Sequence, residues 1–236
     1  MPRDQHPSSL GLRSIALLDA LPAERVDALA RECAWRNYVP DQQIISREAD
    51  DRDLYLIVSG RVRVTTYSAG GRQVTFRDLG AGDCFGDVAA IDGKPRSADV
   101  VALESSLLAA MPPAVFWRLV RENPSVAEYL LRRLAGLVRG LSERVIDLST
   151  LGVQNRIHAE LLRLAREAGV TGNTARIDPA PKHTDIASRV STYREQVTRE
   201  LSALVKAGIL ERGEHALVIL DLARLERIVE EVRGAA

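Results

Sequence analysis

The chain has 236 residues, enough for two compact domains that each have a hydrophobic core. Hydrophobic residues make up 46% and charged residues 27%, which is the composition of an ordinary water-soluble protein. Because 32 basic residues balance 32 acidic ones, the formal net charge is zero. A strong global basic field is therefore excluded, and any contact with nucleic acid must come from a local patch.

The sequence also excludes several classes of protein. No apolar run approaches the length of a membrane span, and residues 1–14 lack the apolar core of a signal peptide. Cys33 and Cys84 are too few and too far apart for a disulfide framework or a metal-binding knuckle. The sequence has no Ser-His-Asp array, metal motif or Walker loop, so we expect neither an enzyme nor a metal site. We expect a cytoplasmic protein with no membrane partner.

The N-terminal half begins with a short helical pattern and continues with strands. Apolar residues recur at helical spacing over residues 14–34, interrupted at Asp19 and Pro22. Over residues 57–86, apolar and polar residues alternate, and glycines mark the turns. Residues 95–112 add two further strands. Many short strands at this spacing predict a closed β-roll or jelly roll.

Residues 84–99 (CFGDVAAIDGKPRSAD) carry the strongest functional signal. Gly86 lets the backbone come close to a ligand, and Asp87 can accept hydrogen bonds from a sugar hydroxyl. A short helix predicted over 88–92 would present free amide groups to an anion, and Arg96 offers a planar fork that matches phosphate oxygens. The plainer alternative is a glycine turn with a surface arginine. We expect a cyclic phosphodiester to bind Gly86, Asp87, Val88, Ala89, Arg96 and Ser97.

This stretch resembles the phosphate-binding cassette of cyclic-nucleotide-binding domains. Arg96 follows Asp87 by nine residues and is preceded by Pro95. That spacing is closer to the cassette of protein kinase A than to the slightly longer one of the bacterial catabolite activator. The resemblance implies that a cyclic nucleotide is the ligand.

A long helix follows the strands. Pro124 can open it and Asn123 can cap it, and the pattern runs to about Leu148. Leucines recur at steps of three or four residues, which predicts a coiled-coil seam between two copies of the chain; the alternative is the core helix of a monomer. Gly136 and Gly140 weaken the helix but permit a close approach on its flank. The predicted dimer contacts are Leu130, Leu134, Leu137, Leu141 and Leu148.

Beyond the long helix, the chain reads as a smaller domain. Gly152 is a candidate hinge, and a helix is predicted over residues 153–168, with Gly169 as its stop. Residues 169–181 read as a polar linker or a short strand. Residues 209–220 predict a β-hairpin, which would form a wing beside the preceding helices.

Residues 182–206 have the pattern of a helix-turn-helix. Thr184 is predicted to cap a first helix that ends at Arg189, residues 190–192 form the turn, and a second helix starts near Tyr193. The apolar positions fall on one face, so the opposite face of the second helix can enter a major groove. Arginine can bind guanine with two donors, and glutamate can accept from cytosine; the alternative is an ordinary solvated helix. The predicted DNA-binding residues are Thr184, Arg194, Glu195, Gln196 and Arg199.

The order of these parts resembles the Crp/Fnr family of bacterial regulators over almost the whole chain. The resemblance implies an α+β fold with a cyclic-nucleotide-binding β-roll domain over 1–122 that includes an N-terminal helix, a dimerisation helix and hinge over 123–151, and a winged helix-turn-helix over 152–236. It implies a homodimer that binds a palindromic operator with TGTGA-like half-sites when the roll holds its nucleotide, and that contacts RNA polymerase. The family's base-reading residues match Arg194, Glu195 and Arg199.

Some positions depart from the family pattern. Asp87 stands where the family usually has glutamate. Counting without gaps from Arg156, the Thr-Ser pair that the catabolite activator offers to adenine falls on Leu141 and Ser142. The arginine that braces the cassette acid falls on Leu137. Recognition of the phosphate is therefore better specified than recognition of the base.

We expect cAMP as the effector, with cGMP close behind or bound as well, and no covalent cofactor. Residues 76–87 resemble a strand of cGMP-dependent protein kinase in which an arginine at the place of Arg77 contacts guanine. Ser97 resembles a hydroxyl residue that such kinases place near the guanine amino group, although the catabolite activator also has serine there. The alternative for Arg77 is a solvent-facing strand residue.

Other effectors and another class of protein are weaker alternatives. Two separated cysteines cannot hold an iron–sulfur cluster. A haem sensor needs an axial ligand, and the four histidines lie outside the predicted roll, which leaves only Pro2 and His6 near the start of the chain. A constitutive DNA binder is not expected to carry a complete cassette. A cyclic-nucleotide-binding regulatory subunit of an enzyme is not expected to carry a helix-turn-helix.

Overall fold

The computed structural model describes residues 9–234, so the alternative at Pro2 and His6 lies outside the described residues. The chain forms two compact units, and the division between them falls between Leu137 and Val138, inside the long helix α5 (Pro124–Thr150). Helix α5 begins at the predicted proline and ends close to the predicted position. The finer boundaries predicted for a separate dimerisation segment stay a prediction.

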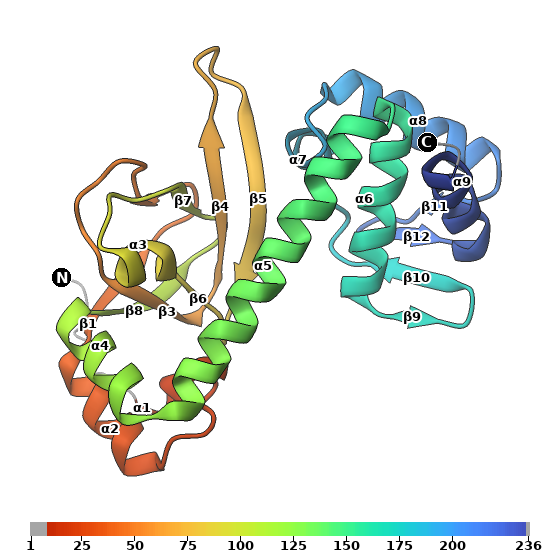
Figure 1. Cartoon of the computed structure of the whole chain (residues 1–236). Helices are drawn as coiled ribbons and strands as arrows, with labels where there is room; N and C mark the ends of the chain where they lie inside the picture. The colour runs from red at the N-terminus through yellow and green to blue at the C-terminus, as the bar shows by residue number, and fades with distance from the viewer. Residues whose placement is uncertain (1–8, 235–236) are drawn as a thin grey trace. The chain divides into compact units, whose positions relative to one another are not determined.

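Residues 34–111 of the N-terminal unit form two four-stranded sheets, and the β4–β5 hairpin reaches beyond the rest of the roll (Figure 1). The first sheet has the strand order β1 (Ala34–Tyr38), β8 (Ser106–Met111), β3 (Leu54–Ser59) and β6 (Cys84–Phe85). The second has the order β2 (Gln43–Ile45), β7 (Asp99–Ala102), β4 (Arg61–Tyr67) and β5 (Gln73–Gly80). The predicted β-roll is confirmed.

The interior of the roll is filled by alternate residues of the strands, because successive side chains of a strand point to opposite faces. In β4, Val62 is fully buried and its neighbour Arg61 is exposed. The rings of Tyr55 and Phe85 stack with their centroids 5.1 Å apart, directly before the cassette. Burying each such side chain stabilises the folded unit by about 1.5–3 kcal/mol. The packed sheets therefore fix the backbone from which the cassette begins.

Helices cover the first sheet of the roll from outside. They are α1 (Ser9–Leu12), the 3₁₀ turn η1 (Ala16–Leu18), α2 (Ala23–Glu32), α4 (Pro113–Glu122) and the start of α5. Asn123 directly precedes α5, as predicted for its cap, and its carbonyl accepts the amide of Val126 at 3.0 Å. Its side-chain amide instead donates to the carbonyl of Leu119 at 2.9 Å and so closes the end of α4. The helices and the sheet share one apolar cluster, which includes Val126 and Leu130 of α5.

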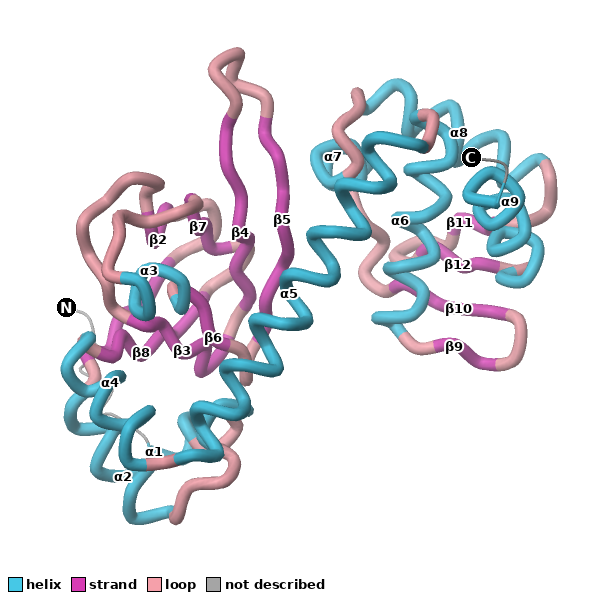
Figure 2. Tube along the Cα trace, viewed as in Figure 1, coloured by secondary structure: helices cyan, strands magenta, loops and turns pink. Residues whose placement is uncertain are grey.

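After the end of α5, the C-terminal unit combines four further helices with a small sheet, whose strands lie together beside the helices (Figure 2). The helices are α6 (Val153–Ala168), α7 (His183–Arg189), α8 (Arg194–Lys206) and α9 (Leu222–Gly234). The sheet has the order β11 (Leu210–Arg212), β12 (Leu217–Ile219), β10 (Thr174–Ile177) and β9 (Val170–Thr171).

The wing predicted over residues 209–220 is confirmed as the β11–β12 hairpin. The stretch predicted as a polar linker or short strand, residues 169–181, instead contains a second hairpin, β9–β10, which pairs with the wing. It joins the sheet because Ala175 and Ile177 alternate with exposed neighbours and are buried. None of the described helices is both long and apolar enough to cross a membrane.

Candidate functional site

The cassette opens at a glycine turn between β6 and the short helix α3 (Asp87–Asp92). Gly86 has a φ of +82°, in the left-handed region that favours glycine. A Cβ at this position would lie 2.6 Å from Nη1 of Arg96 and 2.9 Å from the carbonyl oxygen of Asp53. Both the backbone and the neighbouring arginine therefore require glycine here. The predicted helix is confirmed and begins one residue earlier, at Asp87.

Arg96 is buried, with 2% of its surface exposed. Its Nη1 donates to the carbonyl of Gly86 at 3.1 Å, and its Nη2 donates to the carbonyl of Asp53 at 2.8 Å. Nη2 also pairs with the carboxylate of Asp51 at 2.5 Å, and the Asp51 side chain is 44% exposed. The guanidinium carbon lies 5.6 Å from the ring centroid of Tyr55, within cation–π range. These contacts fix the guanidinium, although its Nε is buried without a hydrogen-bond partner among the described residues.

Acidic groups line one side of this arginine. Burial, and next the charge of Asp51, raise the pKa of Asp53, while Arg36 and Arg96 oppose the rise. The carboxylate beside the guanidinium is that of Asp51, which pairs with Nη2. An incoming anion would have to replace the carboxylate of Asp51 at Nη2 or bind at Nε.

Asp87 is buried and is held by an arginine that sequence reasoning missed. Nε of Arg133, in α5, donates to Oδ2 of Asp87 at 3.2 Å, and Nη2 of Arg133 donates to the carbonyl of Cys84 at 2.5 Å. Oδ1 of Asp87 accepts the amide of Val88 at 3.2 Å. Burial raises the pKa of the Cys84 thiol to about 11, so this thiol stays protonated at neutral pH.

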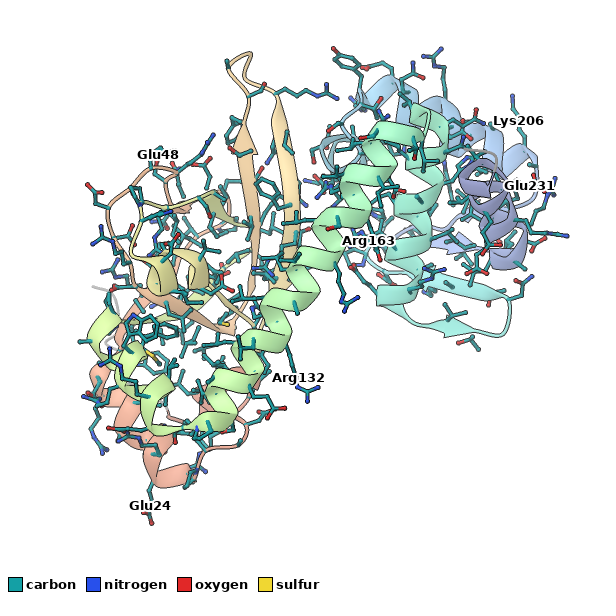
Figure 3. All side chains as sticks on the ribbon, in the orientation of Figure 1. Glu24, Glu48, Arg132, Arg163, Lys206 and Glu231 are labelled. Carbon is teal, nitrogen blue, oxygen red and sulfur yellow. The ribbon has the colours of Figure 1, made fainter. Side chains whose placement is uncertain are left out.

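The bracing arginine was expected at Leu137 by an ungapped count, and that expectation is wrong by one helical turn. Arg133 makes the contact because it continues the buried stripe of Val126 and Leu130 on α5. The neighbouring Arg132 extends away from the helix and pairs with Glu128 at 2.6 Å (Figure 3). The missed signal was therefore the arginine at the right helical spacing from two buried apolar residues.

Arg77 is not the solvent-facing residue of the plainer alternative. It lies in β5, and its Nη2 is 4.0 Å from Oδ1 of Asp87. Burial, and next the charge of Arg133, lower the pKa of Arg77, while Asp87 opposes this. Two arginines from different elements thus approach the same carboxylate.

The other predicted cassette residues lie as follows. Val88 is 36% exposed, Ala89 is buried and Ser97 is exposed. Leu141 and Ser142 belong to the C-terminal unit and are exposed, and the hydroxyl of Ser142 donates to the carbonyl of Val138 in its own helix at 3.0 Å. The structure thus gathers Gly86, Asp87 and Arg96 in one unit with Arg77 and Arg133.

The apolar stripe of α5 differs from the predicted seam. Leu130 is 5% exposed because it packs into the core of its own unit, so the prediction of Leu130 as a dimer contact needs correction. Leu137 is half-buried. The large apolar residues that α5 exposes are instead Leu131, Val138, Leu141, Val145, Ile146 and Leu148.

The helix-turn-helix is formed by α7 and α8, joined by a turn in which Ser191 has a φ of +55°. The turn is closed by a hydrogen bond from the Thr192 amide to the Ala187 carbonyl at 3.0 Å. Thr184 is not the cap that was predicted: α7 already begins at His183, with Lys182 as its N-cap residue, so Thr184 is an exposed residue of the first turn.

Helix α8 has the two faces predicted for a reading helix. Val197, Leu201 and Leu204 are buried against the rest of the unit. Nδ1 of His183 lies 2.7 Å from the hydroxyl of Thr198, which links α7 to α8. The predicted base-reading residues on the other face are exposed, namely Arg194, Glu195, Gln196 and Arg199. This face can present one arginine fork and one carboxylate to base edges.

Residues 35–123 match the family described as cyclic nucleotide-binding domain, and residues 155–228 match the Crp-like helix-turn-helix domain. The cyclic AMP receptor protein of Thermus thermophilus is 32% identical over 218 residues, which cover 92% of this chain and 98% of that protein. The CRP-like cAMP-activated global transcriptional regulator of Mycobacterium tuberculosis is 28% identical over 76% of this chain and 80% of its own length.

The same likeness is found among solved structures. CooA from Carboxydothermus hydrogenoformans superposes with a TM-score of 0.75 at 23% identity, over 84% of this chain and 88% of that chain, which supports the fold alone. The related proteins are transcription regulators rather than enzymes. With a cyclic-nucleotide-binding domain followed by a Crp-like helix-turn-helix, this chain belongs to the Crp/Fnr family of DNA-binding transcription regulators.

Proposed function

We propose that this regulator is a homodimer that binds a palindromic operator when cAMP occupies the cassette. The observation that carries the proposal is the placement of two opposite charges in the roll. Arg96 is held against Gly86, and Asp87 is held by Arg133, so both are fixed before a ligand arrives. A fixed guanidinium and a fixed carboxylate suit the two polar parts of a cyclic nucleotide, its phosphate and its ribose hydroxyl.

The residues present fit a phosphodiester. Nε of Arg96 is a buried donor without a partner among the described residues, and Nη2 is shared between a carbonyl and the half-exposed carboxylate of Asp51. A phosphate oxygen supplies the acceptor that Nε needs, and a second oxygen can take the place of Asp51 at Nη2. The resulting two-point contact is the geometry for which arginine is suited.

The position of Arg77 favours cAMP over cGMP. Arg77 was considered as a guanine contact, but its guanidinium lies beside Asp87, where it supports the acid on the sugar side. The relatives from Thermus thermophilus and Mycobacterium tuberculosis are named for cAMP. We therefore propose cAMP as the effector and keep cGMP as the second candidate.

The register of α5 changes the segment proposed to face the base. The bracing arginine and the Thr-Ser pair were counted four residues apart, on Leu137 and Leu141. Since Arg133 is the residue that braces Asp87, the same step moves the pair to Leu137 and Val138 in place of Leu141 and Ser142. Neither of the two has a hydroxyl, so we propose that the base is held by apolar contact rather than by side-chain hydrogen bonds from this segment.

A second copy of the chain is the proposed occupant of the exposed stripe on α5. Leu131, Val138 and Val145 alternate at heptad spacing with Leu134, Leu141 and Leu148, so two interleaved rows form the a and d positions. Mostly β-branched residues at one row and leucine at the other favour a parallel two-stranded coil. The proposed seam therefore keeps Leu134, Leu141 and Leu148 of the predicted set. It drops Leu130 and Leu137 and adds Leu131, Val138 and Val145.

In a parallel dimer, each subunit offers one α8 to the DNA. We propose that Arg194, Glu195 and Arg199 read base edges in successive major grooves about one helical turn apart, with Gln196 beside them. Thr184, exposed in the first turn of α7, is proposed as a backbone contact. Contact with RNA polymerase stays a prediction.

Two titrations of the full-length protein test the proposal. Calorimetry with cAMP and with cGMP measures effector preference, and fluorescence anisotropy with a TGTGA-type palindrome measures operator affinity with and without each nucleotide. We expect cAMP to bind more tightly and to tighten operator binding. If Arg77 contacts guanine, as the cGMP alternative requires, Arg77→Ala weakens the binding of cGMP more than that of cAMP. If Arg77 only supports Asp87, Arg77→Ala weakens the binding of both nucleotides equally. The same operator affinity with and without each nucleotide would contradict the proposal.

A further inference from the structure

The first helix of the helix-turn-helix ends on two carbonyls that accept hydrogen bonds from other helices. The carbonyl of Arg189, the last residue of α7, accepts from Nη2 of Arg144 in α5. The carbonyl of Val190 accepts from Nε of Arg156 in α6 at 3.0 Å. The last carbonyls of a helix have no partner within the helix and carry its negative dipole end, so guanidinium groups suit them.

Arg156 makes a second contact that reaches the end of α5. Its Nη1 donates to the carbonyl of Leu151 at 2.9 Å, while the amide of Leu151 still continues the helix by donating to Asp147 at 3.0 Å. Leu151 itself is 4% exposed. One planar guanidinium therefore connects the end of α5 to the end of α7 across Gly152.

Glu160, a charged residue of α6, holds the side chain of Arg189 at the end of α7. Glu160 is 9% exposed, and its Oε1 lies 3.3 Å from Nη1 of Arg189. Arg163, on the next turn of α6, also donates to Glu160 through Nε at 2.8 Å. The arginine that ends α7 is thus held at both its side chain and its carbonyl, by α6 and by α5.

We propose that Arg156 and Arg144 are positioning residues that fasten the helix-turn-helix to the C-terminal end of α5, so that the reading helix follows α5. This inference rests on the proposed nucleotide control and corrects where its joint lies. The sequence suggested a hinge at Gly152, but the two-point contact of Arg156 spans that residue. Since α7 packs with α8 in one apolar cluster, fixing the end of α7 also fixes α8.

Glycine at position 152 offers a direct comparison. Gly152 has φ and ψ of −61° and 159°, which any residue adopts. Beyond its two chain neighbours, no described residue has an atom within 4 Å of a Cβ built there. Gly152→Ala therefore stiffens the connection without a clash. If Gly152 is a free hinge, Gly152→Ala should change the effect of cAMP on operator affinity. If Arg156 already holds this joint, Gly152→Ala should leave that effect unchanged.

The test measures operator affinity by fluorescence anisotropy with and without saturating cAMP, in the full-length protein. We expect Arg156→Ala and Arg156→Lys each to reduce the ratio of the two affinities by about fivefold or more, because lysine keeps the charge but loses the two-point fork. Gly152→Ala and Arg166→Ala, an exposed arginine on α6, should leave the ratio unchanged. cAMP affinity by calorimetry should be the same in all variants.

Hydrogen exchange provides a readout that does not depend on the nucleotide. Without cAMP, Arg156→Lys should speed amide exchange at the end of α5 and in the α7–α8 turn, and Arg166→Ala should not. Unchanged exchange in Arg156→Lys, or a coupling ratio that responds to Gly152→Ala and not to Arg156→Lys, would overturn the inference. A wild-type protein without any cAMP effect would overturn the proposed function, while the exchange result would still decide on the joint. If Arg156→Ala does not fold, Arg156→Lys decides.

Discussion

The cassette and the reading helix solve opposite problems. Arg96 and Asp87 in the cassette are 2% and 3% exposed, and each is held by several neighbours of its own chain. Arg194 and Arg199 on α8 are exposed, and the fold fixes only the helix that carries them. A small anion needs charges that are placed in advance, because its few contacts must not be spent on ordering side chains. A DNA groove makes many contacts with a protein, and these contacts can order exposed side chains whose helix is already fixed.

This difference also decides which residues a sequence reveals. An exposed reading face follows from helical periodicity alone, since the buried residues of α8 determine the opposite side. A buried charge needs partners from distant segments, and those partners have no motif of their own. Asp51 and Arg133 were missed for this reason.

The largest effect is expected where an exposed residue becomes buried only in a dimer. Val138 is 63% exposed and lies in the proposed seam. Val138→Asp would place an uncompensated charge in an apolar interface, at a cost of about 3 kcal/mol or more. Sedimentation should detect monomers of this variant, whereas the exposed neighbour Arg139→Asp should remain dimeric. A dimeric Val138→Asp protein would place the interface elsewhere.

Arg96→Ala should lower both the stability of the fold and the affinity for cAMP, because Arg96 is buried and donates to backbone carbonyls. The carbonyls of Gly86 and Asp53 would each lose one donor, which should lower the free energy of unfolding by about 2 kcal/mol. Loss of the phosphate contact should weaken cAMP by about tenfold or more. Denaturant unfolding and calorimetry measure the two effects. Unchanged cAMP titration would remove Arg96 from the site.

Arg194→Ala should act on DNA affinity alone. Loss of a guanine contact should weaken operator binding by about 1–3 kcal/mol and relax the preference at one guanine in each half-site. The free energy of unfolding should change by no more than about 0.5 kcal/mol, because the residue is exposed. Lys206→Ala, at the far end of α8, is the matched control. A large loss of stability in Arg194→Ala would break the contrast with Arg96.

Arg133→Ala and Arg132→Ala form an adjacent pair that tests the bracing of Asp87. Removing Arg133 leaves a buried carboxylate with fewer donors, so cAMP should bind about tenfold more weakly. Arg132 is 80% exposed, and its removal should leave cAMP affinity unchanged. Calorimetry of the two variants compares them directly. Equal affinities would show that Asp87 needs no brace.

Asp51→Asn should have the smallest effect and the opposite sign. Asp51 is the half-exposed partner of Arg96, and the bound phosphate is proposed to take its place. Removing its charge should tighten cAMP binding by about twofold to fivefold at low salt, and the gain should shrink as salt rises. Weaker binding in Asp51→Asn would mean that the carboxylate helps to position Arg96 instead of competing with the phosphate.

Much of the fold could be predicted from local patterns. Strand alternation indicated the roll, the proline and the leucine spacing indicated α5, and the buried positions of α8 left its reading face. The β9–β10 hairpin was harder, because its strands are short and are stabilised by pairing with the wing. The predicted seam of α5 was placed on the wrong residues because two apolar stripes share one helix. Only tertiary packing determines that Leu130 faces the core of its unit while Leu131 faces outward.

In the proposed function, the preorganised cassette controls DNA binding through Arg96. The most direct test of this control is the operator affinity of the wild-type protein and of Arg96→Ala, each measured by fluorescence anisotropy with and without saturating cAMP. We predict that cAMP tightens operator binding of the wild-type protein by about tenfold or more and leaves that of Arg96→Ala unchanged at the same cAMP concentration. Equal operator affinity of the wild-type protein in both conditions would contradict the account.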